Sequence, residues 1–165
     1  MNYKNWIKIS IAIGIILYIC NLYGSIQFKK TLKDSYSQIN QDKDVLEHCN
    51  YKTNGYFVDI GATDGVNISN TYLLEKKYDW NGICIEPQDD YYNKLINNRG
   101  CYTDNSLLFS EKGKEFDFSE AGEFGGITEY IDKHQSAKNN NQIKKISETL
   151  NNILIKYNSP NYIDF

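Results

Sequence analysis

The sequence predicts an α/β domain with a parallel sheet, attached to one N-terminal transmembrane helix. Three observations lead to this prediction. An uncharged, apolar run occupies residues 9–26. Two short runs rich in apolar and β-branched residues, 56–60 and 82–86, lie further along the chain. A glycine-containing loop and a helical pattern over residues 70–77 separate these two runs. Strand, loop, helix and strand in this order are typical of a parallel βαβ unit.

The length and charge of the chain limit its organisation and its partners. Its 165 residues suffice for one folded domain beside an anchor and a tether. We therefore divide the chain into a short flank (1–8), a transmembrane signal anchor (9–26), a polar tether (27–36) and a folded domain (37–165). The formal net charge is −3, and no stretch is densely basic. Because nucleic-acid-binding proteins carry clustered Lys and Arg, we expect no nucleic-acid partner.

The run ISIAIGIILYICNLYGSI, residues 9–26, has the composition of a short membrane-spanning helix. A cleaved signal peptide is one alternative, but no Ala-x-Ala cleavage site follows the run. A buried helix of a soluble domain is another, although such helices usually keep a polar face. We expect an uncleaved anchor, and hence a single-pass membrane protein. Its orientation stays open because lysines flank the run on both sides.

The cysteines and histidines do not have the spacing of a metal site. No C-x-x-C pair exists, and the two histidines lie far apart in sequence, so we expect no bound metal. The spacing also indicates no disulfide framework, and free thiols packed in the core are the simplest interpretation. These residues are Cys20, Cys49, Cys84, Cys101, His48 and His134.

A glycine motif, D-x-G-x-x-x-G, spans Asp59 to Gly65 and begins in the first predicted strand. Gly61 would let the backbone turn off this strand and approach a ligand closely. Gly65 would allow the start of the following helix to pack tightly against the sheet. A purely structural glycine turn is the alternative. Strand, glycine loop and helix together are the context in which such a motif indicates a ligand site.

An acidic residue, Glu86, ends the second predicted strand, about 20 residues beyond Gly65. A nucleotide-binding βαβ unit places the acid that holds the ribose hydroxyls there. Asp59 and Glu86 would then face one site, because ligands bind outside the carboxyl ends of such strands. A solvent-facing Glu at a strand end is the alternative. The loop is not G-x-G-x-x-G, so its spacing favours S-adenosylmethionine over a dinucleotide.

Several stretches resemble the FkbM-type methyltransferase family. The closest are YFVDIGATDG (56–65), SNT (69–71) and WNGICIEP (80–87). Flanking segments are also similar to the family, so the resemblance runs from about residue 37 to the end of the chain. It implies a Rossmann-like sheet that binds S-adenosyl-L-methionine as cofactor, usually for O-methylation of a small-molecule or sugar acceptor.

The resemblance also implies which residues bind the cofactor. Three would belong to the cofactor loop, one would hold the ribose hydroxyls, and two at the end of the third strand would lie near the adenine. In that order they are Asp59, Gly61 and Gly65, then Glu86, then Asp104 and Asn105.

Residues 161–165 (NYIDF) resemble the start of the family's fourth strand. We therefore expect a Rossmann-like sheet that is incomplete at its C-terminus, and we assign no catalytic residue. The main functional hypothesis is a membrane-anchored methyltransferase, active or inactivated by truncation. The same resemblance extends to the Star-like membrane-anchored branch, so a non-enzymatic protein of endoplasmic reticulum, Golgi and endosome trafficking is the alternative. A fragment without function is the third hypothesis.

Two further helices are predicted. Residues 42–49 (DKDVLEHC) have helical character and would pack on the sheet. The segment 136–156 begins polar and is predicted to become a helix from about Gln142. From Ile143 to Leu154 its apolar residues recur at helical spacing, which predicts one face packed on the sheet.

Overall fold

The structure is a computed structural model that describes residues 13–19, 35–131, 137 and 141–165. The chain divides into two compact units, Met1–Ser35 and Tyr36–Phe165. Residues 13–19 of the first unit form a helix with exposed apolar side chains. The expected flank 1–8, most of the expected anchor 9–26 and most of the tether 27–36 lie outside the described residues. Within the described part, no helix has both the length and the apolar character to cross a membrane.

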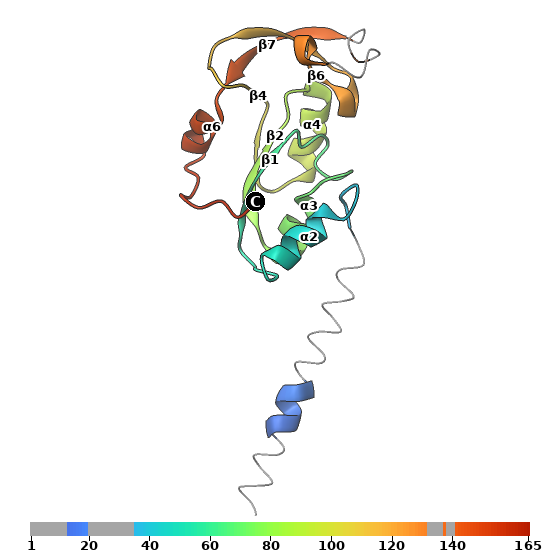
Figure 1. Ribbon diagram of the computed structural model, residues 1–165, viewed down its shortest axis with the longest axis vertical. Helices are drawn as coiled ribbons and strands as arrows, with labels where there is room; N and C mark the ends of the chain where they lie inside the picture. The colour runs from blue at the N-terminus through green and yellow to red at the C-terminus, as the bar shows by residue number, and fades with distance from the viewer. Residues whose placement is uncertain (1–12, 20–34, 132–136, 138–140) are drawn as a thin grey trace, which may run out of the picture. The chain divides into compact units, whose positions relative to one another are not determined.

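The second unit alternates helices and strands (Figure 1). Its first half contains α2 (Gln41–His48), β1 (Tyr56–Ile60), α3 (Tyr72–Tyr78), β2 (Asn81–Ile85), α4 (Asp89–Asn98) and β3 (Tyr102–Asp104). Its second half contains β4 (Leu107–Leu108), β5 (Glu115–Ser119), η1 (Gly122–Phe124), β6 (Gly126–Ile127), η2 (Thr128–Tyr130), β7 (Gln142–Glu148) and α6 (Leu150–Lys156). The predicted α/β class is confirmed.

The first sheet is parallel, with strand order β1-β2-β3. The last residue of the chain lies along the other side of β1. Phe165 donates its backbone N–H to the carbonyl of Tyr56 at 3.3 Å, and its carbonyl accepts from the N–H of Val58 at 2.9 Å. Phe165 is thus hydrogen-bonded to Tyr56 and to Val58, the two residues on either side of Phe57. In a parallel sheet, one residue forms its two backbone hydrogen bonds with partners spaced in this way. The segment 161–165, predicted as the start of a fourth strand, therefore lies beside β1. This arrangement is compatible with a Rossmann-like fold.

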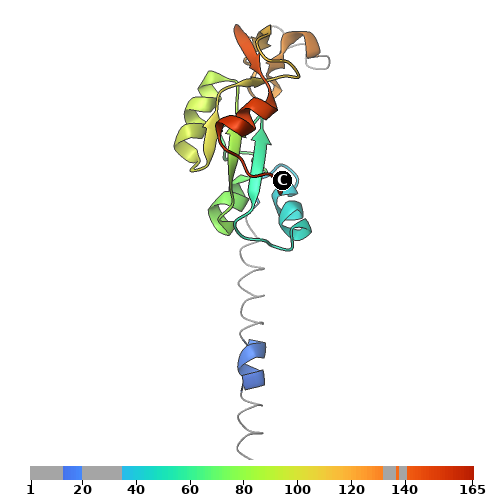
Figure 2. The ribbon, with the colours of Figure 1, turned by 90° about the vertical axis from the view of Figure 1, so that its left-hand side faces the viewer.

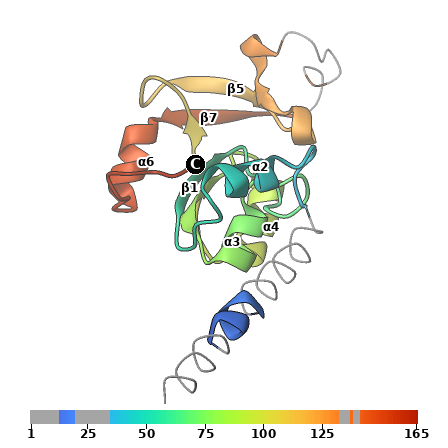
Figure 3. The ribbon, with the colours of Figure 1, turned by 60° about the horizontal axis from the view of Figure 1, so that its bottom comes forward.

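Helices cover both faces of the parallel sheet. Ile83 and Ile85 of β2 are buried with Ile153 of α6 on one face. On the other face, Arg99 follows α4 and places its guanidinium over the ring of Phe57, 5.3 Å from the ring centroid. Figures 1 and 3 show α6 on one side of β1 and α3 and α4 on the other, and Figure 2, seen from the side of α6, shows this helix in front of the parallel sheet. The residues of β2 from Gly82 to Ile85 are therefore buried on both faces, whereas in β1 only Phe57 is fully buried.

The second sheet is mixed, with strand order β4-β7-β5-β6, and it corrects the prediction for residues 142–156. Only α6 is helical there, and the predicted first half of that helix is the strand β7. Its residues 142–146 pair antiparallel with β5, from Glu115↔Ile146 to Ser119↔Gln142 (Figure 3), and its last two residues pair parallel with β4. Isoleucines favour strands when a partner strand is present, so tertiary pairing overrides the helical spacing.

Candidate functional site

Two neighbouring pockets open at the carboxyl ends of β1 and β2. They have volumes of about 200 Å³ and about 90 Å³, and we call them the large lobe and the small lobe of one cleft. The lobes share Ile60, Gly61 and Thr63 as lining residues. Glu86 lines the large lobe, and Asp59 lines the small lobe. The two acids predicted from the sequence therefore lie at one cleft, on either side of the loop that begins at Gly61.

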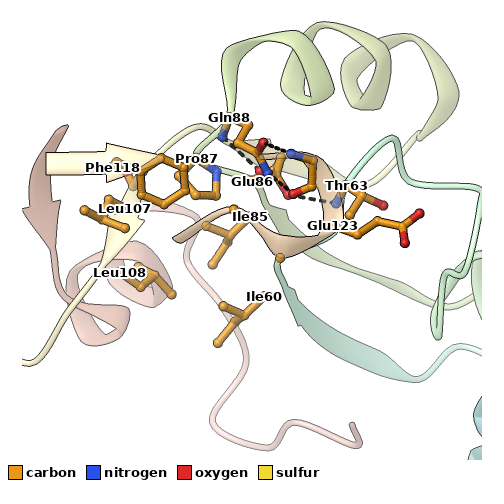
Figure 4. A pocket seen from close by; sticks show the side chains of 14 residues that line it. Ile60, Thr63, Ile85, Glu86, Pro87, Gln88, Leu107, Leu108, Phe118 and Glu123 are labelled. Carbon is orange, nitrogen blue, oxygen red and sulfur yellow. Dashed lines mark hydrogen bonds between the residues drawn. The ribbon is translucent and has the colours of Figure 1, made fainter. Parts of the chain in front are cut away.

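The large lobe has an apolar side and a polar side (Figure 4). Its apolar side chains come from both sheets and from the residue after Glu86: Ile60, Ile85, Pro87, Leu107, Leu108 and Phe118. Four of its polar side chains lie toward the loop and the η1 turn: Thr63, Glu86, Gln88 and Glu123. A fifth polar lining residue, Ser106, directly precedes β4. A ligand with a flat apolar ring and a hydroxylated part would match this division.

The carboxylate of Glu86 is 2 % exposed and is fixed by two backbone groups. Oε2 accepts a hydrogen bond from the N–H of Thr63, and Oε1 accepts one from the N–H of Gln88, both at 2.9 Å. Burial raises the pKa of Glu86, and the neighbouring Asp59 carboxylate adds to the rise. A carboxylate offers about four acceptor positions, so both oxygens keep capacity for further donors such as hydroxyl groups.

The small lobe contains two acceptors that could face a cation. Asp59 Oδ2 accepts a hydrogen bond of 2.5 Å from the hydroxyl of Thr71. Burial raises the pKa of Asp59, although this hydrogen bond and the positive charge of Arg99 oppose the rise. Asn70 lines the same lobe, and its Oδ1 is buried without a hydrogen-bond partner among the described residues. Because a buried polar atom without a partner is costly, this oxygen suggests a donor supplied by a ligand.

The two glycines of the motif have different roles. Gly61 has φ +77°, and no described atom lies within 4 Å of the place where a Cβ would stand, so its backbone is open to the cleft. Gly65 has φ +80°, and a Cβ there would meet Leu95 Cδ1 at 2.6 Å and Arg99 Cγ at 2.7 Å. Gly65 is closely packed, but against the end of α4; the prediction that it brings the start of the following helix against the sheet is not what the structure shows, since α3 begins only at Tyr72. Gly65 does not line either lobe.

Asp104 and Asn105, predicted to lie near the adenine, are not among the residues that line either lobe. Asp104 Oδ2 accepts hydrogen bonds of 2.8 Å from Lys156 Nζ and from the Tyr157 hydroxyl. Burial alone would raise the pKa of Asp104. Hydrogen bonds, of which the one from Lys156 contributes most, outweigh this effect and lower the pKa. Asn105 Nδ2 donates to the carbonyl of Glu86 at 2.9 Å. Asp104 therefore ties β3 to α6, and Asn105 braces the strand end that carries Glu86.

Arg99 is a site residue that the sequence analysis missed. Its buried side chain forms an ion pair with Glu75, with Nε 2.6 Å from Oε2. Nη1 donates to the carbonyl of Gly65 at 3.1 Å, and Nη2 donates to Thr71 Oγ1 at 3.0 Å. Since Thr71 in turn donates to Asp59, Arg99 connects α4 to the loop and to the small lobe. The signal in the sequence is that Arg99 is the only arginine in the chain.

The second sheet also contributes to the cleft, which the sequence analysis did not foresee. Phe118 of β5 lies in the large lobe, where its ring is beside Pro87 (Figure 4). The turn after β5 adds Gly122, Glu123 and Gly125 to the same lobe. The pairing of β5 with β7 fixes the position of these residues, and without it they would not lie next to the parallel sheet.

The charges in the cleft are of one sign. Its charged lining residues are Asp59, Glu86 and Glu123, and no Lys, Arg or His side chain is among its described lining residues. Nor do the described residues contain a cluster of three or more His, Cys, Asp or Glu side chains that could hold a metal ion. The arrangement suits a ligand that combines hydroxyl groups, an apolar ring and a positive charge.

Comparisons with protein-family models, with curated proteins and with solved structures found no match for this chain.

Proposed function

We propose that the unit Tyr36–Phe165 is the cofactor-binding part of a Rossmann-like methyltransferase and that its cleft binds S-adenosylmethionine. One observation carries this proposal. Asp59 lies near the carboxyl end of β1 and Glu86 directly follows the adjacent parallel strand β2, and the two acids line the two lobes of one cleft, joined by the loop at Gly61. S-adenosylmethionine, when bound, supplies an electrophilic methyl group on a sulfonium centre. An O-methylation of a small-molecule or sugar acceptor is the reaction class that we propose.

The chemistry of the two lobes matches the two ends of this cofactor. Glu86 would accept hydrogen bonds from the ribose hydroxyls, and the apolar side of the large lobe would hold the adenine. The small lobe would hold the methionine part, with Asp59 and Asn70 Oδ1 as acceptors for the ammonium group. The open backbone at Gly61 lies between the lobes, where a Cβ would obstruct the ligand.

The charge of the cleft also distinguishes S-adenosylmethionine from a dinucleotide. A dinucleotide would bring the two negative charges of its pyrophosphate next to acidic lining residues. Such sites normally supply basic groups or a helix N-terminus at the pyrophosphate. The cofactor that we propose has no pyrophosphate, and its sulfonium and ammonium groups are both positive. Acidic surroundings therefore favour it.

We also propose that the apolar run 9–26 anchors the protein as a single-pass membrane protein. Its uncharged sequence supports this proposal. The test is extraction of membranes from expressing cells at alkaline pH, which releases peripheral proteins. The full chain should stay in the membrane pellet, and a variant that lacks residues 9–26 should be released. Release of the full chain would contradict an anchored protein.

Calorimetric titration of the full chain in a mild detergent tests the cofactor assignment. We expect saturable binding of S-adenosylmethionine, and at least a roughly tenfold weaker affinity for Glu86→Gln and for Asp59→Asn, because each variant replaces a charge-assisted acceptor. Glu111→Gln is the matched control, because Glu111 is an exposed glutamate outside the cleft. A chain that melts cooperatively but gives no binding heat would contradict the proposal and would favour the Star-like, non-enzymatic alternative.

A further inference from the structure

Two free thiols, those of Cys84 and Cys101, lie against each other beside the candidate site. The Cys101 thiol donates to Cys84 Sγ with a sulfur–sulfur distance of 3.5 Å, although the residues are 17 positions apart in sequence. Cys84 lies in β2, is fully buried, and is the register partner of Asp59. Cys101 directly precedes β3 and is partly exposed. The methyl-transfer proposal uses neither thiol.

We propose that Cys84 and Cys101 are a reversible dithiol–disulfide pair, oxidised by a peroxide. The Cys101 thiolate attacks hydrogen peroxide, the O–O bond breaks, and Cys101 becomes a sulfenic acid while hydroxide leaves. The Cys84 sulfur then attacks the Cys101 sulfur, the S–S bond forms as the S–O bond of the sulfenic acid breaks, and the leaving hydroxide takes the Cys84 thiol proton and departs as water. In total, two thiols and one peroxide give one disulfide and two waters. A thiol reductant reverses the reaction.

The geometry assigns a different role to each cysteine. Only Cys101 has exposed surface, so peroxide meets it first. The hydrogen bond with Cys101 and burial both raise the pKa of the Cys84 thiol, which keeps Cys84 protonated until its neighbour is oxidised. The sulfurs then have to move from 3.5 Å to about 2 Å, the length of a disulfide bond. Cys49 is also a free thiol, but it lies in the turn after α2, and no sulfur contact joins it to this described pair.

Oxidation of this pair would act on the segment that holds the glycine loop. Cys101 is two residues after Arg99, whose side chain bonds Gly65 and Thr71. Between them, the N–H of Gly100 donates to Glu75 Oε1 at 2.9 Å. A bond from Cys101 to Cys84 would tie this segment to β2 and would restrict the opening of the loop. This consequence concerns the free protein and does not depend on which ligand the cleft binds.

Peptide mapping of the full chain tests the disulfide. The protein is treated with hydrogen peroxide, remaining thiols are blocked with N-ethylmaleimide, and the chain is unfolded and digested with trypsin without reductant. We expect one linked pair of peptides, residues 78–94 with residues 100–112, which dithiothreitol separates. Cys49→Ser should keep this link, and Cys101→Ser should lose it. The proposal is overturned if Cys101 is oxidised to sulfinic or sulfonic acid while Cys84 stays reduced, if links scatter among all cysteines, or if both thiols survive.

Hydrogen exchange tests the effect on the loop. In the oxidised chain, the amides of residues 61–71 should exchange severalfold more slowly than in the reduced chain. Residues 115–119 of β5 should exchange equally in both states and serve as the internal control. In Cys101→Ser the peroxide should have no effect on either segment. Equal or faster exchange of residues 61–71 after oxidation would overturn the coupling, even where the disulfide itself has formed.

Discussion

Gln88 and Gly122 are joined at two points across 34 residues of sequence. Gln88 Nε2 donates to the carbonyl of Gly122 at 2.8 Å, and the N–H of Gly122 donates to Gln88 Oε1 at 3.0 Å. Gln88 follows β2, and Gly122 begins the turn that closes the large lobe. A single amide side chain thus holds the turn from the second sheet against the strand end that carries Glu86.

We expect that removing this amide loosens the turn without unfolding the domain. Gln88→Ala loses both hydrogen bonds, whereas Gln88→Glu keeps the acceptor and loses only the donor, since a carboxylate has no N–H. Amides of residues 122–125 should exchange fastest in Gln88→Ala and at an intermediate rate in Gln88→Glu. Asn97→Ala removes an exposed amide of α4 and is the control. Unchanged exchange at residues 122–125 in Gln88→Ala would show that other contacts hold the turn.

The substitutions Gly61→Ala and Gly65→Ala should have different effects on ligand affinity and on the free energy of unfolding. Both positions have positive φ, which costs a residue with a Cβ roughly 1–2 kcal/mol. Gly61→Ala should cost no more than this, because its Cβ enters open space, but it should weaken ligand binding in the cleft. Gly65→Ala should destabilise more, because its Cβ also overlaps Leu95 and Arg99. Urea unfolding and calorimetry measure the two effects. Equal destabilisation by both variants would contradict this division of roles.

Loss of the buried guanidinium should be severe. Arg99→Met leaves the largely buried Glu75 carboxylate with only Lys76 and the N–H of Gly100 as partners, and it removes the hydrogen bonds to Gly65 and Thr71. Together these losses cost about 3–5 kcal/mol in unfolding free energy. The control is Lys144→Met, which breaks an exposed, solvent-screened ion pair with Asp117 and should therefore lower stability much less. Urea midpoints of the two variants and the unchanged chain give the comparison. Similar midpoints for both variants would show that the Arg99 contacts do not stabilise the fold.

The same ion pair should make stability depend on pH in the acid range. Burial raises the pKa of Glu75, but hydrogen bonds from Lys76, Gly100 and Arg99 outweigh it and lower the pKa from 4.5 to about 2. The folded state therefore favours the ionised carboxylate more than the unfolded state does. This contribution is present above about pH 4.5, the pKa of the unfolded state, and is lost as the pH falls toward 2.

Glu75→Gln tests this pH dependence. The variant should be less stable than the unchanged chain at pH 6, and the difference should shrink between pH 4.5 and pH 2. Other carboxylates titrate in the same range, so the difference between the two chains is the quantity to follow. Thermal unfolding at each pH measures it. A constant difference across the acid range would mean that Glu75 is not the group responsible.

Local patterns were enough to predict one half of the domain and the acidic end of its site. The helix predicted at 42–49 is α2, and the strands predicted around Asp59 and Glu86 are β1 and β2. Each of these elements is specified by side chains that are neighbours in sequence, through apolar runs and turn residues. The D-x-G-x-x-x-G spacing likewise predicted that a glycine, Gly61, begins the loop just after Asp59 in the first strand.

Partners distant in sequence decided the rest. Residues 142–148 have helical spacing but form β7, because β5 offers a backbone ladder about 30 residues upstream. Asp104 has the sequence of a polar strand end, but its side chain binds Lys156 and Tyr157 of a distant segment and does not line the cleft. The role of Arg99 depends on Glu75, which is 24 residues away. Local sequence patterns could therefore predict the two acids of the cleft. Burial and strand pairing depend on contacts between residues far apart in the sequence, so only the tertiary structure could show that β5 lines the cleft and that Arg99 holds its loop.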